Sequence, residues 1–142
     1  LWGRLIGLAF ALPLAWFLLA WKLPRSLQFQ LTGLFFLGGA QGALGWYMVQ
    51  SGLVDRPDVS HFRLTAHLGL ALLTFALCWL QALHLRYAGM HPWNPVHWCL
   101  RRHGWACLGL FAITAALGGF TAGLDAGMVY NTFPTLGGHW PP

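Results

Sequence analysis

Four long stretches of the chain are almost free of charged residues, and this feature limits the possible folds more than any other. The stretches are residues 1–21, 29–50, 63–85 and 103–123. An α-helix needs about 20 mostly apolar residues to cross a bilayer, and each stretch has about that length. Strands of a membrane barrel would alternate apolar and polar residues, which these stretches do not do. The pattern predicts an all-α, polytopic membrane protein with four transmembrane helices.

The composition excludes a water-soluble globular domain. Hydrophobic residues make up 57% of the chain and charged residues only 8%, whereas a soluble domain has about 25% charged residues. So few charges cannot cover a surface that faces water. The net charge of +5 does not indicate nucleic-acid binding, because the basic residues lie between the apolar stretches and form no stripe. They are interpreted as signals of membrane topology.

The distribution of lysine and arginine predicts the orientation. One set of connections holds Lys22, Arg25, Arg86, Arg101 and Arg102, and the other side holds Arg4, Arg56 and Arg63 together with Asp55, Asp58 and Asp125. Lysine and arginine are enriched on the cytoplasmic side of membrane proteins. This rule predicts residues 22–28 and 86–102 in the cytoplasm or mitochondrial matrix. Residues 51–62 and 124–142 are then on the outer side.

The start of the chain indicates a piece of a longer protein. Leu1 is not an initiator Met and lies already inside an apolar stretch. A signal peptide is disfavoured, because no small-x-small cleavage site follows and comparable stretches recur later. We expect a single transmembrane helical unit over residues 1–142 that is truncated at both ends.

Of the seven histidines, His67 lies well inside an apolar stretch, about one helical turn from the predicted outer end, whereas His84 and His103 are at the inner ends of such stretches. Ionisable residues within a membrane are candidates for function, and neutral imidazole is a frequent axial ligand of heme iron. Three roles remain open for His67: a bond to a neighbouring helix, a heme-iron ligand, or a proton relay.

A second heme ligand within the chain is not expected. His84 follows His67 by 17 residues, which is about 25 Å along a helix. His61 is predicted in the outer loop and precedes His67 by too few residues to face it across a heme ring. Any second ligand should come from another part of the protein.

Other polar residues within or beside the apolar stretches have two interpretations each. Arg63 shares a helix face with His67 and suits either a heme propionate or the lipid headgroup region. Gln41 could bond to another helix or meet a polar substrate. Glycines four residues apart, such as Gly119 and Gly123, indicate close helix packing or a smooth wall for a flat cofactor.

Histidines and cysteines also gather on the predicted inner side, in a loop that Trp93 and Trp98 would anchor at the interface. The cluster comprises His84, His91, His97, Cys99, His103 and Cys107. Its spacings match no closed zinc pattern, so metal binding there is disfavoured. On the outer side, residues 124–142 combine turn-forming glycines and Pro134 with aromatic residues. This segment is predicted to be a loop that caps the bundle.

Four segments resemble one known family. They are WGRLIGLAFALP (2–13), QGALGWYMVQSGL (41–53), RLTAHLGLAL (63–72) and AGLDAGMVYNTFP (122–134). In order and spacing they are similar to heme A synthases of the proteobacterial and mitochondrial type. The resemblance covers nearly the whole chain, and the second and fourth segments are its most specific parts.

The resemblance implies an eight-helix enzyme of the bacterial or mitochondrial inner membrane, built from two pseudo-symmetric four-helix halves. Such an enzyme oxidises a ring methyl group of heme O to a formyl group and so makes heme A for cytochrome oxidase. It uses heme b as a cofactor and four histidines, two in each half, as heme ligands. Heme O is then the substrate, heme O synthase is a candidate partner, and the electron donor stays open.

The resemblance also assigns residues. His67 matches the ligand histidine of the fourth family helix, in the substrate-side half. Arg63 stays a candidate heme-binding residue on the ground of its spacing to His67. The Glu-x-x-His-Arg motif of the family, with its acidic catalytic residue, is expected before Leu1. The chain would thus hold one of four ligands and would not act alone. The alternatives are a membrane electron carrier that binds heme b, and a transporter or scaffold without heme.

Overall fold

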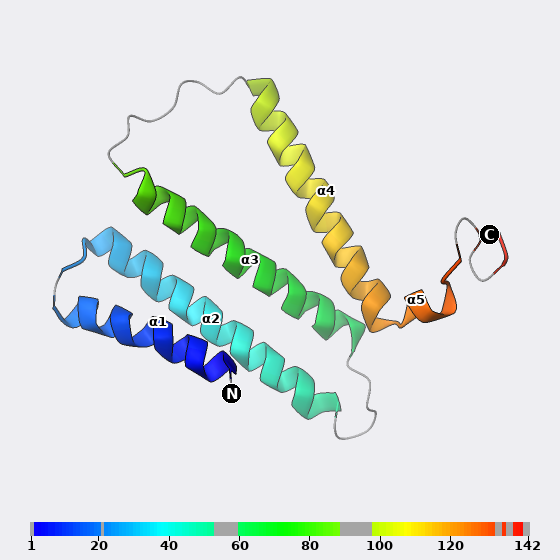
Figure 1. Ribbon diagram of the computed structural model, residues 1–142, viewed down its shortest axis with the longest axis horizontal. Helices are drawn as coiled ribbons and strands as arrows, with labels where there is room; N and C mark the ends of the chain where they lie inside the picture. Colours follow the sequence, from blue (N-terminus) through cyan, green and yellow to red (C-terminus); the bar gives the residue numbers. More distant parts are fainter. Residues whose placement is uncertain are drawn as a thin grey trace. The chain divides into compact units, whose positions relative to one another are not determined.

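The computed structural model describes residues 2–20, 22–52, 60–88, 98–132, 135 and 138–140, with the backbone alone for residues 51 and 52. These residues form the helices α1 (Trp2–Leu19), α2 (Arg25–Gly52), α3 (His61–Arg86), α4 (Trp98–Gly123) and the short α5 (Ala126–Val129), which follow one another along the chain in Figure 1. The described part of the chain contains no β-strand. The prediction of an all-α protein is confirmed.

Three of the helices are long and apolar enough to cross a membrane: α1, α3 and α4. Their most apolar windows have mean hydropathies of 1.6, 1.8 and 1.7. The predicted stretch at residues 29–50 is helical too, within the 28 residues of α2. However, α2 contains four glutamines and six glycines, which lower its hydropathy, and it is not among the candidate spans.

Two helices begin earlier than the apolar stretches that predicted them. α3 begins at His61, so His61 is helical, whereas the sequence predicted it in the outer loop. α4 begins at Trp98, so Cys99, Arg101 and Arg102 are helical as well. The physical reason is length. A helix of 26 residues is about 39 Å long, whereas the hydrocarbon core is about 30 Å thick. In a helix that crosses a membrane, the ends would therefore extend beyond the hydrocarbon core, where tryptophan, arginine and histidine are solvated.

The chain divides into two compact units. The first comprises residues 1–47 and 70–88, and the second comprises residues 48–69 and 89–142, so the division falls within α2 and α3. In the first unit, α1 and α2 are joined by a stacked pair, Phe10 and Phe35, whose ring centroids are 6.3 Å apart with planes 7° from parallel. Leu14, one turn further along α1, is buried.

In the second unit, the C-terminal end of α4 packs closely against the first turns of α3. A Cβ atom added at Gly119 would lie 2.8 Å from Oγ1 of Thr65, and one added at Gly123 would lie 2.6 Å from Cα of His61. Between these glycines, the ring of Phe120 lies 5.9 Å from the ring of His61. Small residues at this spacing let helix backbones approach. For this pair, the close-packing interpretation is confirmed.

The other glycine pairs lie in open space. Nothing is within 4 Å of a Cβ atom added at Gly3, Gly7, Gly38, Gly42 or Gly127. Apolar side chains are equally exposed: among the described residues, only Leu14 and Met48 are buried hydrophobic side chains. Helices that are apolar all round are typical of membrane spans and of helices that further protein covers.

The segment after α4 is not a plain loop, because α5 forms one helical turn within it. Asp125 connects α4 to α5 with a φ of 51°, in the left-handed region that aspartate tolerates better than most residues. Further on, the hydroxyl of Thr132 donates to the carbonyl of Thr135 and accepts from the N–H of Gly138 at 3.3 Å. Pro134, which was part of the predicted cap, lies outside the described residues.

Candidate functional site

His67 lies in the second turn of α3 and is half-buried, with its Nδ1 atom shielded from solvent. Its place on the helix can be compared with the contact to α4, which involves His61, Leu64 and Thr65. At about 100° per residue, His67 lies roughly 120° around α3 from the centre of that contact. The contact with α4 therefore does not include the His67 face of α3.

Arg63 lies on the same side of α3 as His67, one turn nearer the N-terminal end, and is half-buried as well. Four residues correspond to about 6 Å along the axis and to a rotation of about 40°. Arg63 points further from the α4 contact than His67 does. The two candidate residues therefore share a face, and neither belongs to the contact with α4.

His61 is a packing residue. Its ring lies 4.3 Å from the ring of Phe62, and its Cα and Cβ atoms are those that a side chain at Gly123 would meet. His61 and His67 are separated by about 120° around the helix. This geometry supports the prediction that His61 does not face His67 across a heme.

The other predicted residues lie on other helices or further along α3. Gln41 is half-buried on α2, and its Oε1 atom is shielded from solvent. His84 is exposed near the end of α3, and His103 is exposed in the second turn of α4, far along that helix from the glycines that contact α3. His91 and His97 lie outside the described residues.

The predicted inner cluster is not brought together as a metal site. The described residues include no group of three or more histidine, cysteine or acidic side chains that could hold a metal ion. Cys78, Cys99 and Cys107 are free and exposed. The interpretation of Trp98 as part of a loop was wrong, because Trp98 is the first residue of α4.

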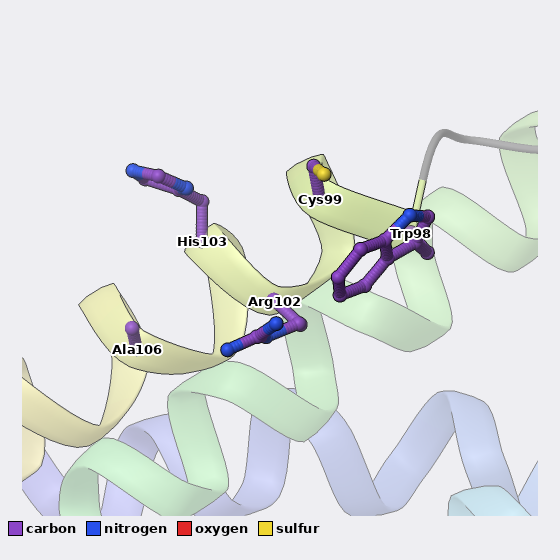
Figure 2. Close-up of a pocket in the computed structure, with 5 residues that line it drawn as sticks. All are labelled: Trp98, Cys99, Arg102, His103 and Ala106. Atoms are coloured by element: carbon purple, nitrogen blue, oxygen red, sulfur yellow. The ribbon is translucent and has the colours of Figure 1, made fainter.

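A shallow pocket of about 370 Å³ lies along the first turns of α4 and was not predicted (Figure 2). It is lined by Trp98, Cys99, Arg102, His103 and Ala106. The guanidinium carbon of Arg102 lies 4.9 Å from the centre of the Trp98 ring. In Figure 2 these two side chains lie together, while His103 points away from them. Such a cation–π pair suits the membrane interface, where both residue types are enriched.

A second groove, of about 480 Å³, lies between α2 and α3 in the first unit. Sequence reasoning missed it, although there was a signal. Gln30, Gln81 and His84 each lie near an end of an apolar stretch, and antiparallel neighbours would bring those ends together.

Comparison with known proteins identifies the family to which the chain belongs. The sequence model of the family described as cytochrome oxidase assembly protein matches residues 1–142. The chain is 49% identical over 142 residues to a heme A synthase of Rhodospirillum centenum, covering 100% of this chain and 38% of that protein. It is 44% identical over 140 residues to the heme A synthase of Paramagnetospirillum magneticum, covering 96% of this chain and 40% of the relative.

A third relative, the heme A synthase of Nitrosospira multiformis, is 46% identical over 141 residues, which are 99% of this chain and 40% of the relative. The chain thus spans about two fifths of the length of the curated relatives it matches. No solved structure gives a significant match. Because the family model matches every residue, the chain belongs to the COX15-CtaA family of cytochrome oxidase assembly proteins.

Proposed function

We propose that the protein carrying this chain is a heme A synthase, an oxidoreductase that converts a ring methyl group of heme O to a formyl group. The observation that carries the proposal is the match of the whole chain, at 44–49% identity, to relatives that bear this name. The heme A made in this way would serve cytochrome oxidase assembly, in agreement with the family description.

The proposed arrangement has four spans in this chain, with α2 as the second of them. α2 supports this assignment by its length of 28 residues and by having no charged residue after Arg25. The spans would be the second to fifth of eight helices in an inner membrane. The excess of lysine and arginine supports an orientation with residues 22–28 and 86–102 inside, and with residues 51–62 and 124–142 outside.

The residues on the side of α3 that does not contact α4 fit a heme. Nδ1 of His67 is shielded, so iron would be bound through Nε2, and the imidazole would hold the substrate ring near the outer end of the helix. Arg63, one turn nearer that end, is placed to bind a propionate in bidentate fashion. Bound heme b would supply redox-active iron. The remaining histidine ligands and the acidic residue are assigned to parts of the protein outside this chain.

The test is made on the full-length protein. It is expressed in cells that make heme O, and the extracted hemes are separated by chromatography. We expect heme A or its hydroxylated intermediate. His67→Ala should abolish heme A formation, whereas His103→Ala, which changes an exposed histidine of α4, should leave it unchanged.

Two outcomes would contradict this assignment. If heme O persisted while the purified protein still held heme b, an electron carrier would be the better account. If His67→Ala left heme A formation intact, the synthase could stand but the ligand role of His67 would be wrong.

A further inference from the structure

The groove between α2 and α3 has polar and apolar ends. It is lined by Phe29, Gln30, Gly33, Leu34, Leu37, Leu77, Leu80, Gln81 and His84. Its three polar residues come from the beginning of α2 and the end of α3, whereas Leu37 and Leu77 lie at the opposite end. Seven residues on each helix separate the two ends, which corresponds to about 10 Å. The groove therefore suits a ligand with a polar head and an apolar tail.

The polar end has hydrogen-bonding capacity that the protein does not use. Within the described part of the chain, the side chains of Gln30, Gln81 and His84 make no hydrogen bond, ion pair or ring contact. Polar side chains near the apolar part of a bilayer gain from a partner. Gln30 and His84 are exposed and Gln81 is half-buried, so all three are available to a ligand that accepts or donates several hydrogen bonds.

The groove also has room. A Cβ atom at Gly33, in the middle of the groove, would meet nothing within 4 Å, and the ring of Phe29 beside it is exposed. A flat ring can approach the backbone at a glycine and lie against an aromatic side chain. The volume of about 480 Å³ falls in the range of roughly 300–1,000 Å³ that is usual for small-molecule sites.

The charge of the lining decides the class of ligand. None of the described residues that line the groove is lysine, arginine, aspartate or glutamate. Within the groove lining a phospholipid phosphate would lack a permanently cationic partner; Arg86, two residues after His84, is exposed and is not part of the lining. Carbonyl oxygens on a neutral ring would accept hydrogen bonds from the amide groups and the imidazole.

We propose that this groove binds an isoprenoid quinone. Its ring carbonyls accept hydrogen bonds from Gln30, Gln81 and His84, its ring lies against Phe29 and Gly33, and its tail follows the leucines. His84 lies 17 residues after His67 on α3, so this site is separate from the proposed heme site. A variant can therefore lose quinone binding and keep heme binding, or the reverse, so the two proposals are tested separately.

The test uses the full-length protein purified in detergent, with ubiquinone-1 as the probe in an equilibrium binding titration. Gly33→Leu places a side chain in the groove and should weaken binding at least tenfold; its Cβ atom meets nothing within 4 Å, so the backbone need not shift to accept it. Gly109→Leu is the matched control: this position of α4 is equally open and lies outside the groove. Gln81→Leu should weaken binding about tenfold through loss of a head-group hydrogen bond. His67→Ala should leave binding unchanged.

A second measurement maps the site without any variant. An azido-quinone is photolysed on the wild-type protein, and labelled peptides should come from residues 29–37 and 77–84. The proposal is overturned if the wild type shows no saturable binding. That result is expected if another part of the protein fills the groove. The proposal is also overturned if Gly33→Leu and Gly109→Leu bind the probe alike, or if dioleoyl phosphatidylglycerol displaces the probe at equal mole fraction.

Discussion

The contact between α3 and α4 makes a sharp prediction for Gly123→Ala. The added Cβ atom would lie 2.6 Å from Cα and 2.7 Å from Cβ of His61. Carbon atoms normally meet at about 3.5–4.0 Å, so one helix must retreat by about 1 Å. The obstructing Cα belongs to the backbone and cannot turn aside as the end of a flexible side chain can.

The expected cost follows from this overlap. Forcing an extra methyl group into a close contact costs about 1–3 kcal/mol. Alanine in place of glycine also stabilises a helix, by up to about 1 kcal/mol. Gly118→Ala separates the two effects, because a Cβ at Gly118 meets nothing within 4 Å. Gly118→Ala changes stability only through the higher helix propensity of alanine. Gly123 is the last residue of α4, so Gly123→Ala gains no more stability from helix propensity than Gly118→Ala does.

The measurement is unfolding of the full-length protein in a titration with sodium dodecyl sulfate, followed by circular dichroism. Gly123→Ala should be less stable than Gly118→Ala by about 1–3 kcal/mol. Heme occupancy should fall as well, because Arg63 and His67 follow His61 in the same helix and move with it. Equal stability of the two variants would show that α3 and α4 do not approach as closely as described, and the reasoning would be refuted.

Three further changes test other parts of the structure. Arg63→Gln should weaken heme retention by roughly ten- to a hundredfold, since a charge-assisted hydrogen bond is worth about 1.5–3 kcal/mol; unchanged occupancy in absorbance titrations would favour a lipid-anchoring role. Asp125→Gly should stabilise the protein by a few tenths to about 1 kcal/mol in the same unfolding assay, because Asp125 has a positive φ that glycine adopts without strain. Phe10→Ala should cost at least about 0.5–1.5 kcal/mol through loss of its stacking with Phe35, and no change in the unfolding midpoint would contradict that pairing.

The apolar stretches were sufficient to predict the long helices but not their ends. Hydropathy identifies the part of a helix that is compatible with hydrocarbon. The hydropathy of the sequence falls at the point where a helix would enter the interface. The backbone continues to form helical hydrogen bonds beyond that point, as at His61 and Trp98. α2 shows the converse, since its glutamines and glycines lower the hydropathy without breaking the helix.

The position of His67 within a candidate membrane span was predictable, because a histidine well inside an apolar stretch is visible in the sequence. The α3–α4 contact was not. Glycines at four-residue spacing occur several times, and only Gly119 and Gly123 meet a close partner. Which pair does so depends on the side chains of the facing helix, here Thr65 and His61, and spacing within one helix carries no information about them.

The polar composition of α2 has a consequence for how the protein enters the membrane. Glutamine and glycine weaken the insertion of a single segment by the translocation machinery, whereas α1 is strongly apolar. The two helices are separated by only five residues and are joined by the Phe10–Phe35 pair. Entry as a helical hairpin would let α1 carry its more polar partner into the bilayer. Biogenesis of α2 would then depend on α1, and mutations in the first helix would cause topological errors in the second.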